Sequence, residues 1–227
     1  TQNQGRHLKE VLRLDHHGAL SHLEPVSLRA CRDFAGFRRI DPRFVVTGAA
    51  DADATFAIAA LAGLLPTPGP GSQLLPDARL LDLARIVAQS DLAPFARRWE
   101  ESEAGLLLLC YKQRMKNGRH DAAAFCAGVE CWRELVTDPP HDLLATVRAE
   151  ETARVALARQ ATVVRLGPDV AFVECPAWGW DVWYAEIAPV IVAYVRESGR
   201  CSIGCRDQQT AVRLFGSDGL LGVARVL

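Results

Sequence analysis

The chain has 227 residues, of which 49% are hydrophobic and 23% are charged. This is the composition of a folded globular protein, and it excludes an intrinsically disordered chain. Lysine and arginine together number 26 and aspartate and glutamate 27, so the formal net charge is −1. A nearly neutral chain lacks the strong positive field that is typical of proteins binding long nucleic acids or anionic membranes. We therefore expect neither kind of partner.

The cysteine content and the apolar segments indicate the compartment. The longest apolar stretches, such as residues 57–66, are too short to cross a bilayer, and residues 1–9 lack the apolar core of a signal peptide. Seven cysteines are an odd number spread over the chain, which is not the pattern of a disulfide scaffold. We therefore expect reduced thiols in a cytoplasmic protein.

The first part of the chain predicts two short strands and several helices. Residues 11–14 and 44–48 are apolar runs that end abruptly in polar residues or glycine, as strands buried in a parallel sheet do. Helical spacing of the apolar residues predicts helices over 25–34, 51–65, 77–89, 94–116, 121–135 and 140–158.

The pattern changes between residues 160 and 169, where short strands separated by turns replace the helices. Strands are expected over 162–166, 170–174, 189–194 and 201–205, and helices over 181–187 and 208–215. We therefore expect an α/β protein with two domains. A helix-rich N-terminal domain around a parallel sheet would cover residues 1–160, and a small C-terminal α/β domain would cover residues 161–227.

The first candidate site is Asp15-His16-His17, directly after the first expected strand. Parallel sheets place ligand groups at the carboxyl ends of their strands. A carboxylate oxygen combined with imidazole nitrogens suits Mn²⁺, Fe²⁺ or Zn²⁺ better than Mg²⁺ or Ca²⁺. Three consecutive side chains cannot all point the same way, so one metal ion would take one or two of them. The alternative is an exposed polar turn in which the histidines bond to the backbone.

The second candidate is the pair Asp51 and Asp53, which follows the second expected strand and opens a helix. Two carboxylates spaced in this way are a common metal-binding device. The alternative is that they stabilise the helix start, because aspartate is favoured there as an N-cap and as a partner of the helix dipole. That alternative explains one aspartate more readily than both.

Together these segments resemble the DHH phosphoesterase superfamily, which includes single-strand exonucleases, oligoribonucleases, cyclic-dinucleotide phosphodiesterases and inorganic pyrophosphatases. Asp15-His16-His17 matches the motif that names the family, and Asp51-Ala52-Asp53-Ala54 resembles its D-x-D-(A/G) element. Near the C-terminus, Ser202-Ile203-Gly204-Cys205-Arg206 is similar to the pattern that precedes the Gly-rich substrate loop of the family. The resemblance therefore touches both expected domains.

The sequence departs from the family pattern at three places. The D-x-D element of the family precedes D-H-H, whereas here it follows, so either the order is changed or Asp51 and Asp53 correspond to a later single-Asp motif. Thr47 stands where the family commonly has a metal-binding histidine, and residues 215–220 are only a remnant of the Gly-rich loop. These departures put a complete two-metal site in doubt and leave one-metal and non-catalytic versions open.

The resemblance implies a metal-dependent hydrolase. Its substrate would be a phosphodiester or phosphoanhydride of a small nucleotide or short oligonucleotide. A divalent metal, Mn²⁺ above others, would be held by Asp15, His16, Asp51 and Asp53. His16 or His17 would also stabilise charge during catalysis, and Arg206 would bind the substrate phosphate. The alternative for Arg206 is a surface arginine without a ligand.

Two other functions stay open at this point. One is a degenerate, non-catalytic relative that binds a nucleotide or a protein partner. The other is an unrelated protein in which the D-H-H triplet is accidental. A homodimer is compatible with each of these functions, and the sequence does not fix the oligomeric state.

An aromatic group, Trp178, Trp180, Trp183 and Tyr184, stands out in the C-terminal part. Such groups more often pack a small domain or an interface, and we expect packing here. The alternative is a surface on which a nucleobase stacks.

Overall fold

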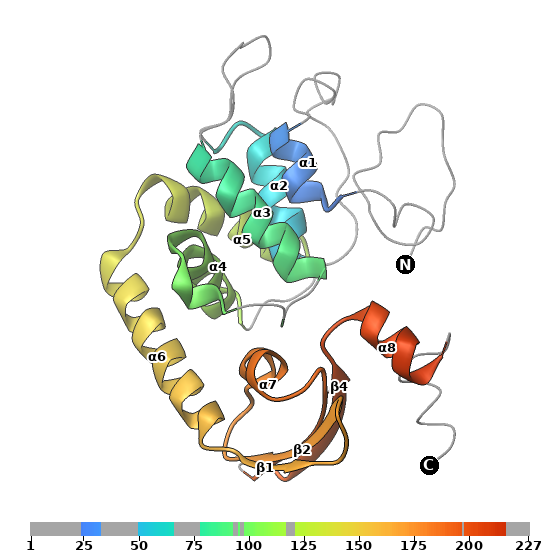
Figure 1. The fold of residues 1–227 in the computed structure, drawn as a ribbon. Helices are drawn as coiled ribbons and strands as arrows, with labels where there is room; N and C mark the ends of the chain where they lie inside the picture. Colours follow the sequence, from blue (N-terminus) through green and yellow to red (C-terminus); the bar gives the residue numbers. More distant parts are fainter. Residues whose placement is uncertain are drawn as a thin grey trace. The chain divides into compact units, whose positions relative to one another are not determined.

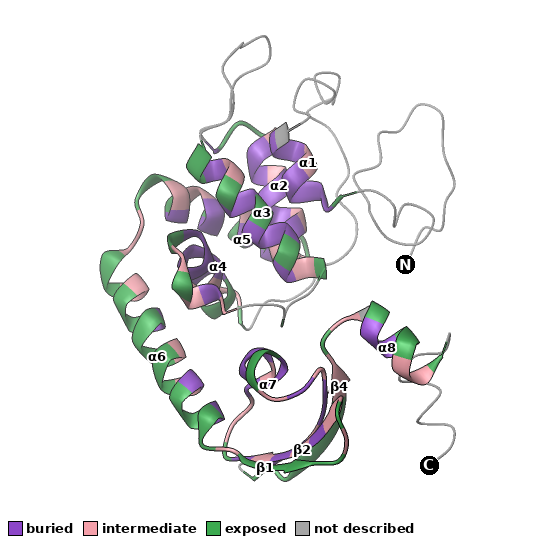
Figure 2. Cartoon of the chain, viewed as in Figure 1, coloured by how far each residue is buried: buried purple, intermediate pink, exposed green. Residues whose placement is uncertain are grey.

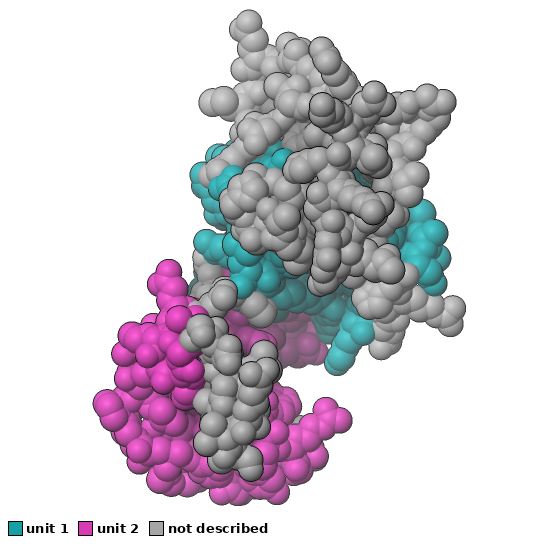
Figure 3. Space-filling view, turned by 90° about the vertical axis from the view of Figure 1, so that its right-hand side faces the viewer, with its two compact units in different colours: residues 1–92, 101–145 teal, residues 93–100, 146–227 magenta. Residues whose placement is uncertain are grey.

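The structure, a computed structural model, describes residues 24–32, 50–65, 78–92, 95, 98–116, 121–196 and 198–216. These residues fall into two compact units (Figure 3). Unit 1 contains the described residues of 1–92 and 101–145, and unit 2 contains those of 93–100 and 146–227. The division lies between residues 145 and 146, inside a helix, whereas the sequence suggested a boundary at the end of that helix.

Unit 1 is helical throughout its described part (Figure 1). Its central element is α2 (Ala52–Leu61), which contacts all four other complete helices of the unit. Alanines fill much of α2, and these small side chains let neighbouring helices approach closely. The surrounding helices are α1 (Val26–Arg32), α3 (Ala78–Leu92), α4 (Glu103–Arg114) and α5 (Ala122–Thr137). The two strands expected in this part, residues 11–14 and 44–48, lie outside the described residues.

Two helix boundaries in unit 1 differ from the expected ones. The single helix expected over 94–116 is wrong, because α4 begins only after Ser102, whose hydroxyl oxygen accepts a 3.1 Å hydrogen bond from the amide of Gly105. A separate 3₁₀ turn, Trp99–Glu101, precedes it. The helix expected over 51–65 ends at Leu61, and Gly63 then adopts a φ of 70°, a left-handed conformation that favours glycine.

Unit 2 contains a four-stranded sheet in the order β1-β2-β3-β4 (Figure 1). The outer pairs β1–β2 and β3–β4 are antiparallel, and the central pair β2–β3 is parallel with α7 (Trp180–Glu186) as its connection. The sequence predicted each strand to within one residue at either end. The strands are β1 (Thr162–Arg165), β2 (Val170–Cys175), β3 (Val190–Val195) and β4 (Arg200–Cys205), and α8 (Gln208–Phe215) follows them. The general α/β class is thus confirmed, with a helix-rich first part and a small mixed sheet.

One face of this sheet carries the core of unit 2 (Figure 2). Alternate residues of β2 and β3 are buried there because successive side chains of a strand point to opposite faces. The buried set also includes residues of α6 (His141–Arg159) and α7, and comprises Val155, Ala158, Ala171, Val173, Cys175, Val182, Trp183, Tyr184, Ala188, Ile191, Ala193 and Val195.

Polar bonds fix α7 against α6. The guanidinium of Arg154 donates two hydrogen bonds of 2.7 Å to the buried carboxylate of Asp181. Burial disfavours the charged form of Arg154, but the bonds to Asp181 and Glu151 outweigh it and raise its pKa. The indole N–H of Trp183 donates to the carbonyl of Ala158 at 3.0 Å.

The described part of the chain contains no helix that is both long enough and apolar enough to span a membrane.

Replacing Asp181 with asparagine should destabilise the protein, because Arg154 would lose its buried bidentate partner and keep only Glu151 as a carboxylate partner. With the side chain of Arg154 29% exposed, we expect a loss of about 2 kcal/mol in the free energy of unfolding, below the range for fully buried pairs. Urea unfolding followed by tryptophan fluorescence measures this loss. Glu186→Gln is the matched control, because it breaks the exposed pair with Arg159 and should barely move the midpoint. Equal midpoints for Asp181→Asn and the wild type would contradict the assigned role.

Candidate functional site

The structure tests only part of the predicted metal site. Asp15, His16 and His17 lie outside the described residues, and so does Thr47. Their roles therefore remain predictions. Asp51 and Asp53 in unit 1 and Arg206 in unit 2 are described.

Asp51 is the N-cap of α2 and is exposed. Its backbone is extended, and its Oδ1 accepts a 2.8 Å hydrogen bond from the amide of Ala54. Its backbone carbonyl accepts a 2.6 Å bond from the Thr55 hydroxyl. The capping role that the sequence offered as an alternative is thus confirmed for Asp51.

A buried network holds this helix start in place. The Thr55 hydroxyl lies 2.7 Å from the phenol oxygen of Tyr111, and the indole N–H of Trp132 donates to Thr55 Oγ1 and to the carbonyl of Ala52, both at 3.2 Å. The Trp132 ring stacks on Tyr111 with centroids 4.4 Å apart. Burial raises the pKa of Tyr111 to about 12, so the phenol is neutral at physiological pH.

Gly128 of α5 makes room for this network. A Cβ atom at this position would lie 2.7 Å from both Thr55 Cγ2 and the Tyr111 phenol oxygen. Such distances are too short for real contacts, so a side chain here would displace the hydroxyl pair. The buried side chains of Thr55, Tyr111 and Trp132 thus hold the backbone at the start of α2, whereas Asp51 itself is exposed.

Asp53 has a different environment. It is only 3% exposed, and its carboxylate binds the start of α1. Oδ2 accepts a 3.0 Å bond from the amide of Val26, and Oδ1 accepts a 3.1 Å bond from the amide of Ser27 and another bond from the Ser27 hydroxyl. The first amides of a helix have no partner within the helix, so Asp53 supplies acceptors for two of them. It ties α1 to α2 across 26 residues of sequence.

The two carboxylates therefore do not form a pair on one side of α2. Asp51 is exposed and caps its own helix, whereas Asp53 is buried and caps a neighbouring one. Among the described residues, no group of three or more His, Cys, Asp and Glu side chains could hold a metal ion. The predicted ligand set also includes Asp15 and His16, which lie outside the described residues. On donor geometry, Asp51 fits a metal ligand better than Asp53 does.

Arg206 directly follows β4 in unit 2. Its backbone amide donates to the carbonyl of Pro189 at 2.8 Å, which fixes the backbone at the strand end. Its Nε donates to Asp207 Oδ2 at 3.0 Å, and the side chain is 50% exposed. Asp207 also caps α8 by accepting from the amide and hydroxyl of Thr210, and these bonds, together with Arg206, lower the pKa of Asp207. Since its terminal nitrogens have no bond to the described residues, Arg206 can offer them to an anion.

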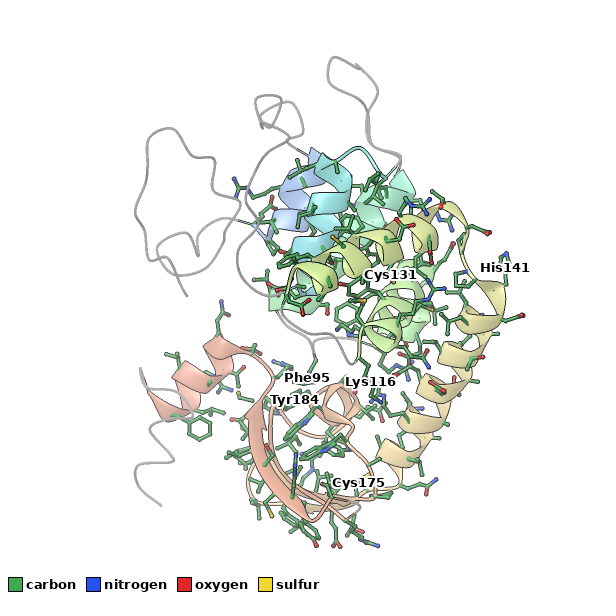
Figure 4. All side chains as sticks on the ribbon, turned by 180° about the vertical axis from the view of Figure 1, so that it is seen from behind. Phe95, Lys116, Cys131, His141, Cys175 and Tyr184 are labelled. Carbon is green, nitrogen blue, oxygen red and sulfur yellow. The ribbon has the colours of Figure 1, made fainter. Side chains whose placement is uncertain are left out.

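The aromatic residues of unit 2 pack as expected. Trp183 and Tyr184 are buried in the core, and the half-buried Trp178 and Trp180 pack against it. Phe95, labelled with Tyr184 in Figure 4, adds a fourth ring around Trp180 at a centroid distance of 6.4 Å. Phe95 was missed from the sequence because it lies more than eighty residues before the other rings, and no local pattern links it to them.

Replacing Asp53 with alanine should destabilise unit 1 even without any metal, because the amides of Val26 and Ser27 would lose their acceptor. We expect a loss of about 2–3 kcal/mol, which combines a lost helix cap with buried donors left unpaired. Urea unfolding in the presence of a chelator measures it.

The matched change Asp51→Ala removes an exposed cap and should cost about 1 kcal/mol. If Asp53→Ala has the wild-type midpoint in chelator and a lower midpoint than the wild type only when metal is present, Asp53 serves a metal rather than the fold.

No protein-family model matches the chain, and no curated protein and no solved structure matches it. The chemistry of the candidate site is therefore inferred from its own residues.

Proposed function

We propose that the chain is a metal-dependent phosphoesterase of the DHH type that hydrolyses a phosphodiester or phosphoanhydride of a small nucleotide or short oligonucleotide. The main support is the accessible carboxylate of Asp51 at a rigidly held helix start, in a chain that also carries Asp15-His16-His17. A second support is Arg206, which follows β4 in a separate small α/β unit, at the place that the family pattern gives to a phosphate-binding arginine.

The proposed metal is Mn²⁺, held by Asp15, His16 and Asp51, with Asp53 as a further ligand. A bound divalent metal lowers the pKa of its water and polarises a phosphoryl oxygen. Asp51 can take part because it is exposed and an aspartate oxygen has more than one acceptor site. Asp53 would have to share a carboxylate that already accepts from Val26 and Ser27, so its main role in this proposal is to hold α2 against α1.

The remaining steps belong to the side chains of the chain itself. His16 or His17 would donate a hydrogen bond to the charge that develops on the phosphoryl group. Arg206 would bind the substrate phosphate through its terminal nitrogens, while Asp207 holds its Nε. A guanidinium suits this role because its planar donors match phosphate oxygens in pairs.

One observation favours a second function, nucleotide or partner binding without catalysis. Both oxygens of Asp53 accept hydrogen bonds from the start of α1, as expected for a carboxylate with a structural role. Thr47, in place of a ligand histidine, agrees with this. Metal affinity separates the two functions, because a degenerate site would have lost tight Mn²⁺ binding.

Calorimetric titration of Mn²⁺ into chelator-treated protein tests the proposed function. The wild type should bind Mn²⁺ and hydrolyse a dinucleotide in a Mn²⁺-dependent reaction, and Asp15→Ala should abolish both. Asp82→Ala is the matched control, because Asp82 is exposed on α3 and its loss should change neither property. Asp53 is avoided in this test, since its replacement would disturb the fold.

No Mn²⁺ binding by the wild type would reject the enzyme in favour of the binding function. Hydrolysis retained by Asp15→Ala would reject the role assigned to the D-H-H segment.

A further inference from the structure

Four aromatic rings gather on one side of unit 2. We call Phe95, Trp178, Trp180 and Tyr184 the aromatic cluster. Trp180 is its centre: it is nearly parallel to Trp178, with an interplanar angle of 16° and centroids 5.4 Å apart, and it stacks on Tyr184 at 5.6 Å and 30°. The ring of Phe95 is tilted by 42° against that of Trp180, and Phe95 is 46% exposed. The cluster packs on the core below through Trp183, whose ring meets Trp180 edge-on.

The polar edges of the aromatic cluster lack acceptors in the described part of the chain. Trp132 and Trp183, the fully buried tryptophans, donate their indole N–H groups to backbone or hydroxyl oxygens. The N–H groups of Trp178 and Trp180 and the hydroxyl of Tyr184 make no such bond to any described residue. Tryptophan and tyrosine usually find a partner for these groups when they are buried. Phe95, Trp178 and Trp180 thus keep part of their apolar surface exposed, and the two indole N–H groups have no acceptor among the described residues.

The turn that carries the two half-buried indoles is held firmly. A Cβ atom on Gly179, which lies between them, would come within 2.3 Å of the Cβ of Ala158 on α6. Only glycine therefore lets this turn lie so close to α6. The hydrogen bond from the Trp183 indole to the carbonyl of Ala158 also holds α7 on α6. The positions of Trp178 and Trp180 therefore do not depend on a bound ligand.

Strand β4 continues the surface of the aromatic cluster. A Cβ atom on Gly204 would lie 2.1 Å from the Tyr184 hydroxyl oxygen and 3.0 Å from the Trp180 ring. Both side chains can pack against the backbone of β4 here because Gly204 has no side chain. Ser202 and Arg200 share this side of β4, because alternate residues of a strand face the same way. They lie about 7 and 13 Å further along the strand. Both are exposed, and Arg200 has no ion pair with any described residue.

We propose that the aromatic cluster binds a nucleobase, with the base stacked on the exposed surface of the half-buried indoles. Stacking on aromatic side chains tolerates every base because each has a π-face. The hydroxyl of Ser202 and the cation of Arg200 extend the surface towards ribose and phosphate. This inference deepens the proposed function by placing recognition of the base in unit 2, and in that respect it rests on the proposed function.

A nucleobase fits the aromatic cluster better than a proline-rich peptide does. Grooves that bind such peptides are also lined with aromatic rings, but the peptide supplies no anion for Arg200. The peptide is therefore kept as an outcome of the test.

Indole ¹⁵N–¹H NMR of the complete chain tests this inference, because the five tryptophans give five separate signals. The signals are assigned with single Trp→Phe variants. Adenosine 5′-monophosphate and adenosine, added in the presence of a chelator, should shift the signals of Trp178 and Trp180 and leave those of Trp132 and Trp183 unchanged. Ribose 5-phosphate, which lacks the base, should shift none of them.

Two variants support the assignment: one changes Trp178, just before α7, and the other changes Ile203 on β4. Trp178→Ala should weaken the binding of adenosine 5′-monophosphate about tenfold or more, which is the usual effect of removing one stacking ring. Ile203→Ala removes a residue that is 43% exposed on the opposite side of β4 and should leave the affinity unchanged. Circular dichroism confirms that both variants are folded.

Three results would overturn the inference: no indole shift with the nucleotide, equal shifts with ribose 5-phosphate, or shifts with a proline-rich peptide alone. The chelator keeps this test separate from that of the proposed function. Base binding without Mn²⁺ binding would reject the enzyme and keep the nucleobase site. Mn²⁺-dependent hydrolysis with silent indoles would reject the nucleobase site alone.

Discussion

A carboxylate that is almost completely buried is tolerated in a protein only when hydrogen-bond donors compensate it. Asp53 meets this requirement through the amides of Val26 and Ser27 and the hydroxyl of Ser27. The bonds tie α1 to α2, and α2 contacts every other complete helix of unit 1. The same constraint defines the candidate site, because it commits Asp53 to the fold and leaves Asp51, two residues earlier, as the accessible carboxylate of the helix start.

The strands of unit 2 were predictable because their signal is local. β3 consists almost entirely of apolar and β-branched residues, and turn residues bound it on both sides. The start of α4 was missed because Ser102 lies inside a run with helical spacing, and only the observed cap shows where the helix begins. The role of Asp53 depends on Ser27, which is 26 residues away and on another helix. No pattern within a short window could have linked the two, and the same holds for Phe95 and Trp180.

The two units differ in the chemical groups that they offer. The helical unit offers a carboxylate on a backbone that buried hydroxyls and an indole hold rigid. The small sheet unit offers Arg206, the exposed β4 strand and a group of rings with unused donors. Acidic oxygen ligands suit a metal that activates water, and cations with aromatic surfaces suit a nucleotide.

The central claim is that Asp15, His16 and Asp51 hold one divalent metal ion. Anomalous diffraction at the manganese edge, from crystals of the full chain grown with Mn²⁺, tests it most directly. We expect one anomalous peak about 2.0–2.3 Å from a carboxylate oxygen of Asp15 and a ring nitrogen of His16, with Asp51 in the same coordination shell. The absence of a peak beside Asp15, with Asp15 and Asp51 far apart, would contradict the claim and leave D-H-H an accidental triplet.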